Sequence, residues 1–353
     1  MRFMTAGESH GTKLAAIIDG FPAGVPIDKE IIAGLLQRRR RASGRSARME
    51  KEGDHVEYLS GITAGTTTGM PIAFTIENNP LFQDAGMQDR WSKQAEPITV
   101  PRPGHVDLPG VARYGNEDCR VAAERASARE TAVRTAVGGF ALQLLGHLGM
   151  QVTSCQLTAA GEANIDEVIS AARHDGDTVG GTVSVVMEGL PGGIGCCYGE
   201  GRLDSRLAAA IMALPAVKAV SLGPGLTTAD SLGSRYTDKY TRDNGMWRRG
   251  SNNAGGIEGG ITNGEPVALT FAVKPVPTRG GTESFDFTTG LPATAPVPRH
   301  DICAAAAAAV VAESVMGWVI ADALVCQLNG TSLETLTREL DNMRKRWEAL
   351  TSC

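Results

Sequence analysis

The alanine-rich segment at residues 302–328 constrains the fold most, because a helix formed there would be apolar on nearly all sides. Such a helix has no face to present to water, so it must pack against another helix over most of its surface. Glu313, Gly317 and Asp322 interrupt the segment, and no uninterrupted apolar run approaches the ~20 residues that a membrane span needs. The sequence therefore predicts a buried core helix that starts after Asp301, and no membrane partner.

Three further helices are indicated by their caps and by the spacing of their apolar residues. Asp28 is the expected N-cap of a helix whose last turn is the basic run at residues 38–41. A longer helix is expected over residues 124–147, with Gly149 just beyond its end. The last helix is expected to open with a capping box that begins at Thr331.

Strand-like segments lie between these helices, at residues 151–157, 182–187 and 267–273. Strands and helices alternate without a regular βαβ rhythm, and no G-x-G-x-x-G fingerprint follows a strand. A dinucleotide-binding α/β fold is therefore not indicated. The favoured class is α+β, with sheets packed on a helical layer.

Four irregular stretches are longer than the ~12–15 residues of ordinary connections. They contain arginine, histidine, tryptophan and glycine in specific groupings, which is typical of the walls of a site. The four stretches are residues 40–54, 78–115, 227–256 and 275–299. We expect a single domain over residues 1–353 with these stretches as long active-site loops.

The charge pattern favours a small anionic ligand over a polyanion. The net charge is −5, so no global basic field attracts nucleic acid or an anionic membrane. A basic cluster nevertheless occupies residues 38–41, Arg45 and Arg48. It can be a solvated charge run, a nucleic-acid patch, or a bidentate clamp for a multiply charged small anion. No aromatic residues are interleaved with it, which weakens the nucleic-acid interpretation.

Two histidines are candidates for acid–base chemistry. His10 lies between small residues in the pentapeptide at residues 7–11, where it can approach a ligand closely. His105 follows a Pro-Gly turn, beside Arg102, and Asp107 can orient its ring. Either segment alone is more often an ordinary turn than a site.

Further cationic groups and a carboxylate lie where helices are expected to begin. Arg125 and Arg129 fall at the start of the long helix, where free N–H groups and the helix dipole favour anions, although a solvated first turn is the simpler alternative. Lys274 and Arg299 add charge, and Asp301 is either catalytic or the N-cap of the alanine-rich helix. No metal-ligand spacing appears. The residues together predict an anion-binding enzyme with acid–base assistance, but not a particular reaction.

Taken in order, these segments resemble the chorismate synthase family along the whole chain. The pentapeptide GESHG at residues 7–11, the segment RASARETAVRTAVG at residues 125–138 and the Arg299-His300-Asp301 triplet match its three signatures. Additional matches are found at residues 59–61, 67–72, 102–107, 259–264 and 274–278.

The resemblance implies a fold and a reaction. The implied fold is a β-α-β sandwich with a helical layer between antiparallel sheets. The implied enzyme is a lyase of the shikimate pathway, which serves aromatic amino-acid biosynthesis, and it converts 5-enolpyruvylshikimate 3-phosphate to chorismate by anti-1,4 elimination of phosphate. Reduced FMN is the implied cofactor, required without net redox change because it donates electron density and recovers it.

The resemblance also implies roles for individual residues. His10 would protonate the departing phosphate, His105 would protonate or hydrogen-bond the reduced flavin, and Asp301 would assist proton removal. The implied flavin contacts are Arg125, Ala126, Ser127, Gly259, Lys274, Pro275, Val276, Pro277, Thr278 and Arg299. The implied contacts to the substrate phosphate and carboxylates are Arg39, Arg45, Arg102 and Arg129, of which the first two are also assigned to NADP(H).

The resemblance further implies a cytoplasmic homotetramer that binds neither nucleic acid nor membrane. The chain shows no insertion for a flavin reductase of its own, so an external reductase is expected, with NADPH only as an indirect reductant. Val106, Pro215 and His300 depart from the usual family residues or vary within it. Pro215 would lose a side-chain amide contact to the flavin, and His300 adds a titratable group beside Asp301.

Three rival interpretations remain at this point. The basic cluster can bind nucleic acid, which predicts salt-sensitive binding without a flavin preference. His10 can be the nucleophile of a phosphate-ester hydrolase that needs no flavin. The chain can also be a family member that binds flavin but has no activity.

Overall fold

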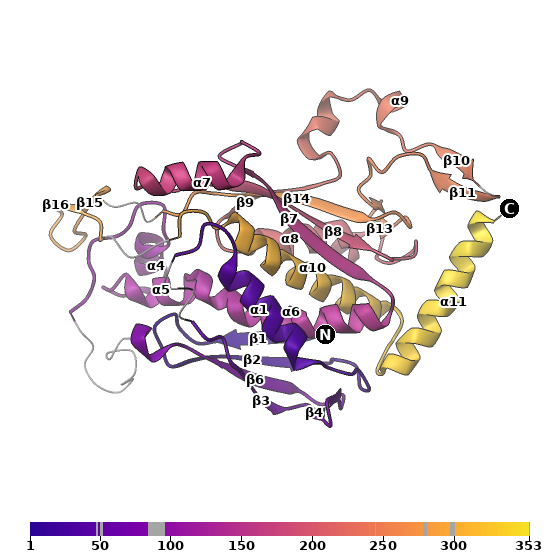
Figure 1. The fold of residues 1–353 in the computed structure, drawn as a ribbon, viewed down its shortest axis with the longest axis horizontal. Helices are drawn as coiled ribbons and strands as arrows, with labels where there is room; N and C mark the ends of the chain where they lie inside the picture. Colours follow the sequence, from indigo (N-terminus) through magenta and orange to yellow (C-terminus); the bar gives the residue numbers. More distant parts are fainter. Residues whose placement is uncertain are drawn as a thin grey trace.

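The protein folds into three layers, two antiparallel sheets with a helical layer between them (Figure 1). The computed structural model describes residues 1–46, 49, 52–83, 96–243, 245–277, 281–296 and 301–352. The layered arrangement confirms the predicted α+β class and the helical layer between antiparallel sheets.

The first sheet, at the bottom of Figure 1, comes from the N-terminal part of the chain. Its strands in sheet order are β1 (Arg2–Ala6), β2 (Lys13–Asp19), β6 (Ile72–Glu77) and β3 (Val56–Ser60). All neighbouring strands pair antiparallel. Alternate side chains such as Leu14, Ile18 and Phe74 are fully buried, because side chains on a strand point alternately to the two faces and one face packs on the helices.

The second sheet lies on the opposite side of the helical layer. Its strands in sheet order are β7 (Gln151–Ala159), β8 (Gly181–Glu188), β14 (Val267–Val273) and β9 (Val217–Leu222). The pairing is again antiparallel, and the three predicted strands are confirmed. Val183 and Val185 on β8 and Leu269 and Phe271 on β14 are buried against the helices.

The helical layer consists mainly of three helices. They are α1 (Lys29–Arg41), α6 (Thr131–His147) and α10 (Ala305–Gln327). α10 is the predicted alanine-rich helix, and it packs against α1, α6, β7 and β8. Its close approach to α6 needs small residues, since a Cβ added at Gly138 would lie 2.2 Å from the Cβ of Ser314. The alanine-rich sequence therefore serves close packing on all sides, as predicted.

By length and composition alone, α10 could also cross a membrane, contrary to the expectation that its polar residues make it too short. However, 78% of its most apolar window is buried inside the molecule. A mostly buried helix of this kind is the core helix of a folded domain.

The predicted continuity of the long helix is wrong. The expected long helix at residues 124–147 is three pieces, α5 (Arg120–Ala126), the 3-10 turn η2 (Ala128–Glu130) and α6. Ser127 breaks it, because its backbone is extended and its side chain accepts a hydrogen bond from the N–H of Arg129, in competition with the helix ladder.

The caps also differ from expectation in two helices. The last helix, α11 (Leu333–Thr351), is capped by Ser332 rather than Thr331, with the Ser332 hydroxyl accepting from the N–H of Thr335. The shift arises because the backbone at Thr331 and Leu333 is hydrogen-bonded to Ala23. The N-cap alternative for Asp301 is wrong, since α10 begins at Ala305 and has no side-chain cap. Asp28 caps α1 as predicted.

The remaining elements are helices, turns and short hairpins outside the two four-stranded sheets. The helices and turns are η1 (Pro80–Phe82), α4 (Asp107–Tyr114), α7 (Ile165–His174), η3 (Gly199–Gly201), α8 (Leu203–Met212), η4 (Gly225–Asp230) and α9 (Gly233–Tyr236). The short hairpins are β4 (Ile62–Thr63) with β5 (Thr66–Thr67), β10 (Tyr240–Asp243) with β11 (Met246–Arg249), β12 (Ile257–Glu258) with β13 (Ile261–Thr262), and β15 (Glu283–Phe285) with β16 (Pro292–Thr294).

Candidate active site

A cavity of about 600 Å³ gathers most of the predicted site residues from segments far apart in the sequence. We call it the arginine cavity. The predicted residues that line it are His10, Arg39, Arg45, Arg102, His105, Ala126, Ser127, Arg129, Lys274, Val276, Pro277 and Asp301. Both histidines, four arginines and one carboxylate therefore face a common space, as an anion-binding site with acid–base groups requires.

His10 lies on the tight loop between β1 and β2. Gly7 begins this loop at φ +107°, and a Cβ there would come within 2.5 Å of the Lys13 carbonyl oxygen, so the close approach requires glycine. The loop is held against the end of α5, where Glu124 contacts both the backbone N–H and the Nδ1 of His10, each at 2.7 Å. His10 is thus fixed in both its backbone and its ring.

His105 lies just before α4, on a different segment from His10, and a different carboxylate holds it. Asp107 contacts its Nδ1, as the sequence predicted, and also accepts hydrogen bonds from the Arg102 side chain at 2.7 and 2.9 Å. Burial acts to raise the pKa of Asp107, but the hydrogen bonds from His105 and Arg102 outweigh it and hold that pKa below its ordinary value. Asp107 is therefore a shared anion between a histidine and an arginine.

Arg39 is the most deeply buried cation of the cavity, with 1% of the residue exposed. Its Nε donates to the Thr131 hydroxyl and its Nη2 to the Ala128 carbonyl oxygen, both at 2.9 Å. Its Nη1 has no hydrogen-bond partner among the described residues. Burial, followed by the positive charge of Arg45, lowers the pKa of Arg39 to about 9. An anion in the cavity would stabilise this guanidinium.

Arg129 is anchored by a buried carboxylate and by backbone. Its Nε donates to the side-chain oxygen of Asn78 at 2.7 Å, and its Nη1 contacts Asp54. Asp54 also lies within ion-pair distance of Arg39 and Arg40, at 3.6 and 3.4 Å. Three arginines therefore share Asp54, and Glu52, 3.8 Å from Arg129, is a second buried carboxylate beside them. Three cations against two carboxylates leave excess positive charge beside the cavity.

Arg45 and Asp301 form an ion pair that connects two distant segments. The Asp301 carboxylate contacts Arg45 and accepts a hydrogen bond from the N–H of Ser46 at 2.8 Å. The Nε of Arg45 has no hydrogen-bond partner within the described part of the chain. Asp301 therefore holds the loop that contains Arg45 and Ser46 instead of capping a helix.

The wall formed by the segment after β14 combines a cation with apolar groups. Lys274 donates to the Gly104 carbonyl oxygen at 2.5 Å, which joins this wall to the His105 turn. Burial and the nearby Lys218 lower the pKa of Lys274. Val276, Pro277 and Pro215 line the cavity beside it and provide an apolar surface.

Several predicted residues lie away from the arginine cavity or outside the described residues. Arg125 turns toward β1, where it donates to the Thr5 carbonyl oxygen at 3.0 Å. Pro275 faces Gly180, and Gly259 occupies the turn of the β12–β13 hairpin. Thr278 and Arg299 lie outside the described residues, as do Arg48 and His300.

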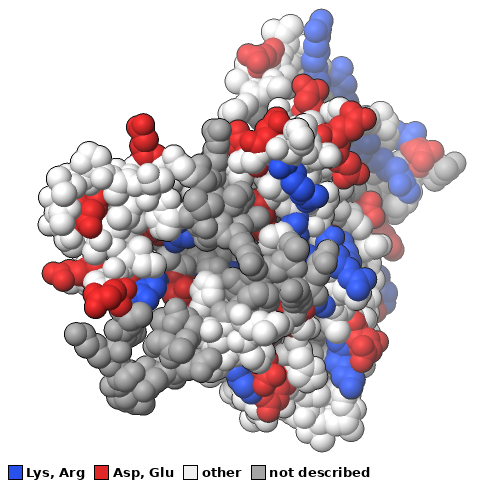
Figure 2. Space-filling view, turned by 60° about the vertical axis from the view of Figure 1, so that its left-hand side comes forward, with Lys and Arg blue, Asp and Glu red and all other residues white. Residues whose placement is uncertain are grey.

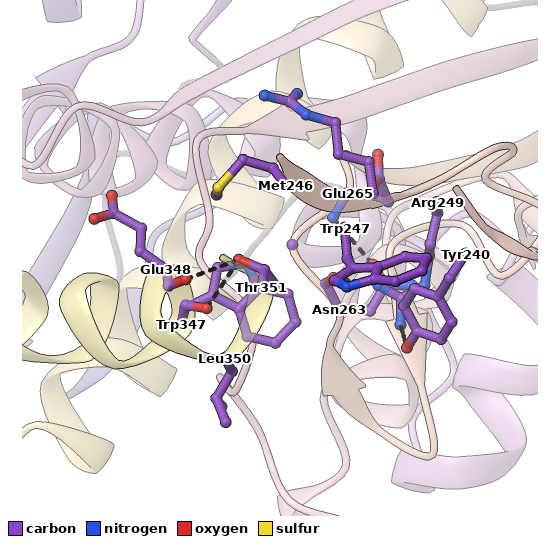
Figure 3. Close-up of a pocket in the computed structure, with 12 residues that line it drawn as sticks. Tyr240, Met246, Trp247, Arg249, Asn263, Glu265, Trp347, Glu348, Leu350 and Thr351 are labelled. Atoms are coloured by element: carbon purple, nitrogen blue, oxygen red, sulfur yellow. Dashed lines mark hydrogen bonds between the residues drawn. The ribbon is translucent and has the colours of Figure 1, made fainter. Parts of the chain in front are cut away.

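The stretch at residues 227–256 contributes no residue to the described lining of the arginine cavity, contrary to expectation. It forms α9 and the β10–β11 hairpin, which lines a second hollow together with α11. Figure 3 shows Trp247, Tyr240 and Arg249 on one side of this aromatic groove and side chains of α11 on the other. The Arg249 guanidinium lies 4.9 Å from the centre of the Tyr240 ring and pairs with Glu258.

Sequence reasoning missed the acidic residues that position the cavity's cations and histidine. Glu124 immediately precedes the Arg125 motif but was predicted only as the start of a helix. Glu52 and Asp54 follow the basic loop, and Asp54 is buried with a left-handed backbone at φ +46°. The available signal for these partners was the pair Glu52 and Asp54, two carboxylates that flank a glycine shortly after the run of arginines.

The basic cluster is exposed only in part within the described residues: Arg38 and Arg41 are exposed, whereas the other described members turn inward. Arg39 is buried, Arg38 pairs with Glu313 at 2.8 Å, and Arg45 pairs with Asp301. Figure 2 shows acidic and basic side chains interspersed on the face that it presents. The inward-facing arginines favour an enclosed anion over a polyanion lying on the surface.

Comparison with known proteins gives a consistent result. A family model described as chorismate synthase matches residues 1–325. Chorismate synthase of Caldanaerobacter subterraneus subsp. tengcongensis is 42% identical over 348 residues, covering 97% of both chains. Chorismate synthase of Bacillus licheniformis is 38% identical, covering 98% of this chain and 99% of its own. A solved structure titled Crystal Structure of Chorismate Synthase aligns with a TM-score of 0.79 at 30% identity, covering 99% of this chain and 98% of that one.

Proposed function

Because this chain belongs to the chorismate synthase family, a family of lyases, we propose that its arginine cavity binds 5-enolpyruvylshikimate 3-phosphate beside reduced FMN. The reaction is the anti-1,4 elimination of phosphate, which gives chorismate without net redox change. One observation supports this most: two histidines and four arginines from separate segments line one cavity, and buried N–H groups of Arg39 and Arg45 lack hydrogen-bond partners among the described residues. Phosphate and carboxylate oxygens would satisfy them.

The described residues fit a flavin as well as an anionic substrate. Val276, Pro277 and Pro215 offer an apolar wall for a planar ring, and Lys274 supplies a cation beside it. Ala126 and Ser127 line the cavity at the break between α5 and η2. When bound, reduced FMN would supply electron density to the substrate and recover it. The excess positive charge from Arg39 and Arg129 would favour an anionic reduced flavin and a leaving phosphate.

Three groups of the chain manage protons in this proposal. His10 donates a proton to the departing phosphate from a loop that Glu124 holds. His105, held by Asp107, donates toward the flavin ring from the opposite segment. Asp301 assists proton removal, and its contacts with Arg45 and with the N–H of Ser46 hold its carboxylate in place. Arg39, Arg45, Arg102 and Arg129 bind the substrate's anionic groups.

We further propose a cytoplasmic homotetramer, folded as one domain over residues 1–353, that depends on flavin reduced by a separate reductase. NADPH acts only indirectly, through that reductase. These points rest on family membership and on the resemblance of the sequence motifs. Sedimentation velocity measures the assembly, and an assay with oxidised FMN and NADPH, with and without an added reductase, measures the dependence.

The decisive experiment is an anaerobic assay of the purified protein with 5-enolpyruvylshikimate 3-phosphate, with and without reduced FMN, that follows chorismate absorbance. We expect product only with reduced FMN. Phosphate release without flavin would instead identify a hydrolase that uses His10. No turnover by the folded protein, with flavin still bound, would identify an inactive family member. Salt-sensitive binding of RNA without flavin binding would point to the nucleic-acid alternative.

A further inference from the structure

Glu124 makes two hydrogen bonds to the same residue, His10, through its two different oxygens. Oε2 accepts from the backbone N–H of His10 and Oε1 contacts Nδ1 of the ring, both at 2.7 Å. The backbone carbonyl oxygen of Glu124 also accepts from the N–H of Ser9, at 3.2 Å. The end of α5 therefore fixes the loop, the backbone and the ring of His10 together.

The charge of Glu124 is directed to His10 alone among the ion-pair partners that the described residues provide. Asp107, by contrast, divides its carboxylate between His105 and Arg102. The Glu124 side chain is 10% exposed, so its contact with Nδ1 is only weakly screened by water. A carboxylate on Nδ1 favours the ring form that carries a proton there, because a carboxylate only accepts.

We propose that Glu124 is a positioning residue for the general acid: it holds the proton of His10 on Nδ1 and so directs Nε2 to the reacting phosphate. The assignment rests on the proposed role of His10 in phosphate release. The ring that acts as the acid carries a proton on each nitrogen: it transfers the one on Nε2, and the ring that remains is neutral with its other proton still donated to Glu124. The proton passes to a phosphate oxygen as the carbon–oxygen bond of the substrate breaks and the bonding electrons leave with the phosphate.

The test replaces the carboxylate by an amide of the same shape. A carboxylate accepts from both N–H groups of His10, whereas Glu124→Gln has one accepting oxygen and one donating nitrogen. If the amide oxygen keeps the backbone N–H, its nitrogen faces Nδ1 and favours the opposite tautomer. Glu124→Asp retains a carboxylate, and Glu200→Gln removes an exposed glutamate elsewhere as a matched control.

The first readout is the tautomer of His10 in substrate-free protein, measured by two-bond proton–nitrogen correlation spectra of protein labelled with [15N]histidine. The His10→Asn variant assigns the signal among the 6 histidines of the chain. We expect the proton on Nδ1 in the parent protein and in Glu124→Asp, and a shift of population toward Nε2 in Glu124→Gln. An unchanged tautomer in Glu124→Gln would overturn the proposal, whatever reaction the protein catalyses.

The second readout is turnover with reduced FMN. We expect kcat to fall about 10²-fold in Glu124→Gln with little change in KM, and less than about tenfold in Glu124→Asp. The double variant His10→Asn with Glu124→Gln should be no slower than His10→Asn, because Glu124 acts through His10. Equal losses in Glu124→Asp and Glu124→Gln, or full kcat in Glu124→Gln, would show that Glu124 only supports the loop. A parent protein without turnover would contradict the proposed function and leave the tautomer result standing.

Discussion

The arginine cavity and the aromatic groove have similar volumes, about 600 and about 630 Å³, but opposite chemistry. In the groove, Arg249 is paired with Glu258 and lies over Tyr240, and Arg248 is largely exposed to solvent. In the cavity, the side chains of Arg39 and Arg45 are buried, and each lies within ion-pair distance of a carboxylate. One N–H group of each still has no hydrogen-bond partner among the described residues.

The difference shows that unsatisfied N–H groups on buried cations, more than size, distinguish a site for an anionic ligand. A buried amide in the groove, the Nδ2 of Asn263, also lacks a partner within the described chain, but it is neutral. A buried N–H group of a guanidinium costs more to leave without an acceptor than that of a neutral amide, so an anionic ligand that accepts from it is favoured. The groove's aromatic and paired groups are satisfied without a ligand.

The largest expected effect is on stability, from the carboxylate that three arginines of the cavity share. Asp54→Asn removes the buried anion that Arg39, Arg40 and Arg129 share and leaves only Glu52, at 3.8 Å from Arg129. We expect a loss of about 3–5 kcal/mol in the free energy of unfolding. Urea denaturation measures it. Added inorganic phosphate should restore more stability to this variant than to the parent. A loss below about 1 kcal/mol would mean that the cavity tolerates uncompensated charge.

The second effect is on turnover. His10→Ala and His105→Ala should each reduce kcat with reduced FMN by about 10²-fold or more, since each removes a proton donor. The matched change in the groove, Trp247→Leu, should leave kcat within about twofold of the parent. Stopped-flow or steady-state chorismate formation measures all three. Full rates in both histidine variants would remove the acid assignments and the contrast between the two hollows.

The third effect separates activity from stability at the Arg45 loop. Asp301→Asn loses the negative charge that holds Arg45, and we expect about a tenfold fall in kcat. Asp301 does not cap α10, but it is the ion-pair partner of the buried Arg45 side chain, so the melting temperature should also fall, by less than in Asp54→Asn. A large fall in melting temperature with full activity would show that the ion pair only stabilises the loop.

The fourth effect is a pH dependence of stability from Asp107. Its pKa is lowered in the folded protein, so its contribution is present above the ordinary aspartate pKa and is lost as pH falls below it. We expect the parent to lose about 1 kcal/mol per pH unit through this group below about pH 4. Asp107→Asn should flatten this part of the curve of unfolding free energy against pH. Parallel curves for the two proteins would contradict the assignment.

The smallest effect is expected at the hairpin beside the groove. Asp243 pairs with Arg248 at 3.9 Å, and both side chains are more than half exposed. Asp243→Asn makes the same chemical change as Asp54→Asn, but it should alter the free energy of unfolding by less than about 0.5 kcal/mol. A loss as large as that of Asp54→Asn would remove the distinction between buried and surface charge on which the comparison depends.

Local patterns in the sequence determined much of the fold and of the site. The apolar surface of α10, the cap at Asp28 and the alternation on β14 each follow from interactions within a few residues, so they were predicted correctly. The family motifs likewise identified His10, His105 and the four arginines, which the structure brings to one cavity. The break of the long helix at Ser127 was missed, because a side chain there competes with the helix ladder.

Only the tertiary structure decided which groups are partners across the chain. Glu124 meets His10 from 114 positions away, and Asp301 holds Arg45 from 256 positions away, so no local pattern contains either pair. The tertiary structure also placed the stretch at residues 227–256 at the aromatic groove rather than at the arginine cavity. Sequence specifies which chemical groups are present, whereas burial and long-range proximity fix which charges are compensated and which remain for a ligand.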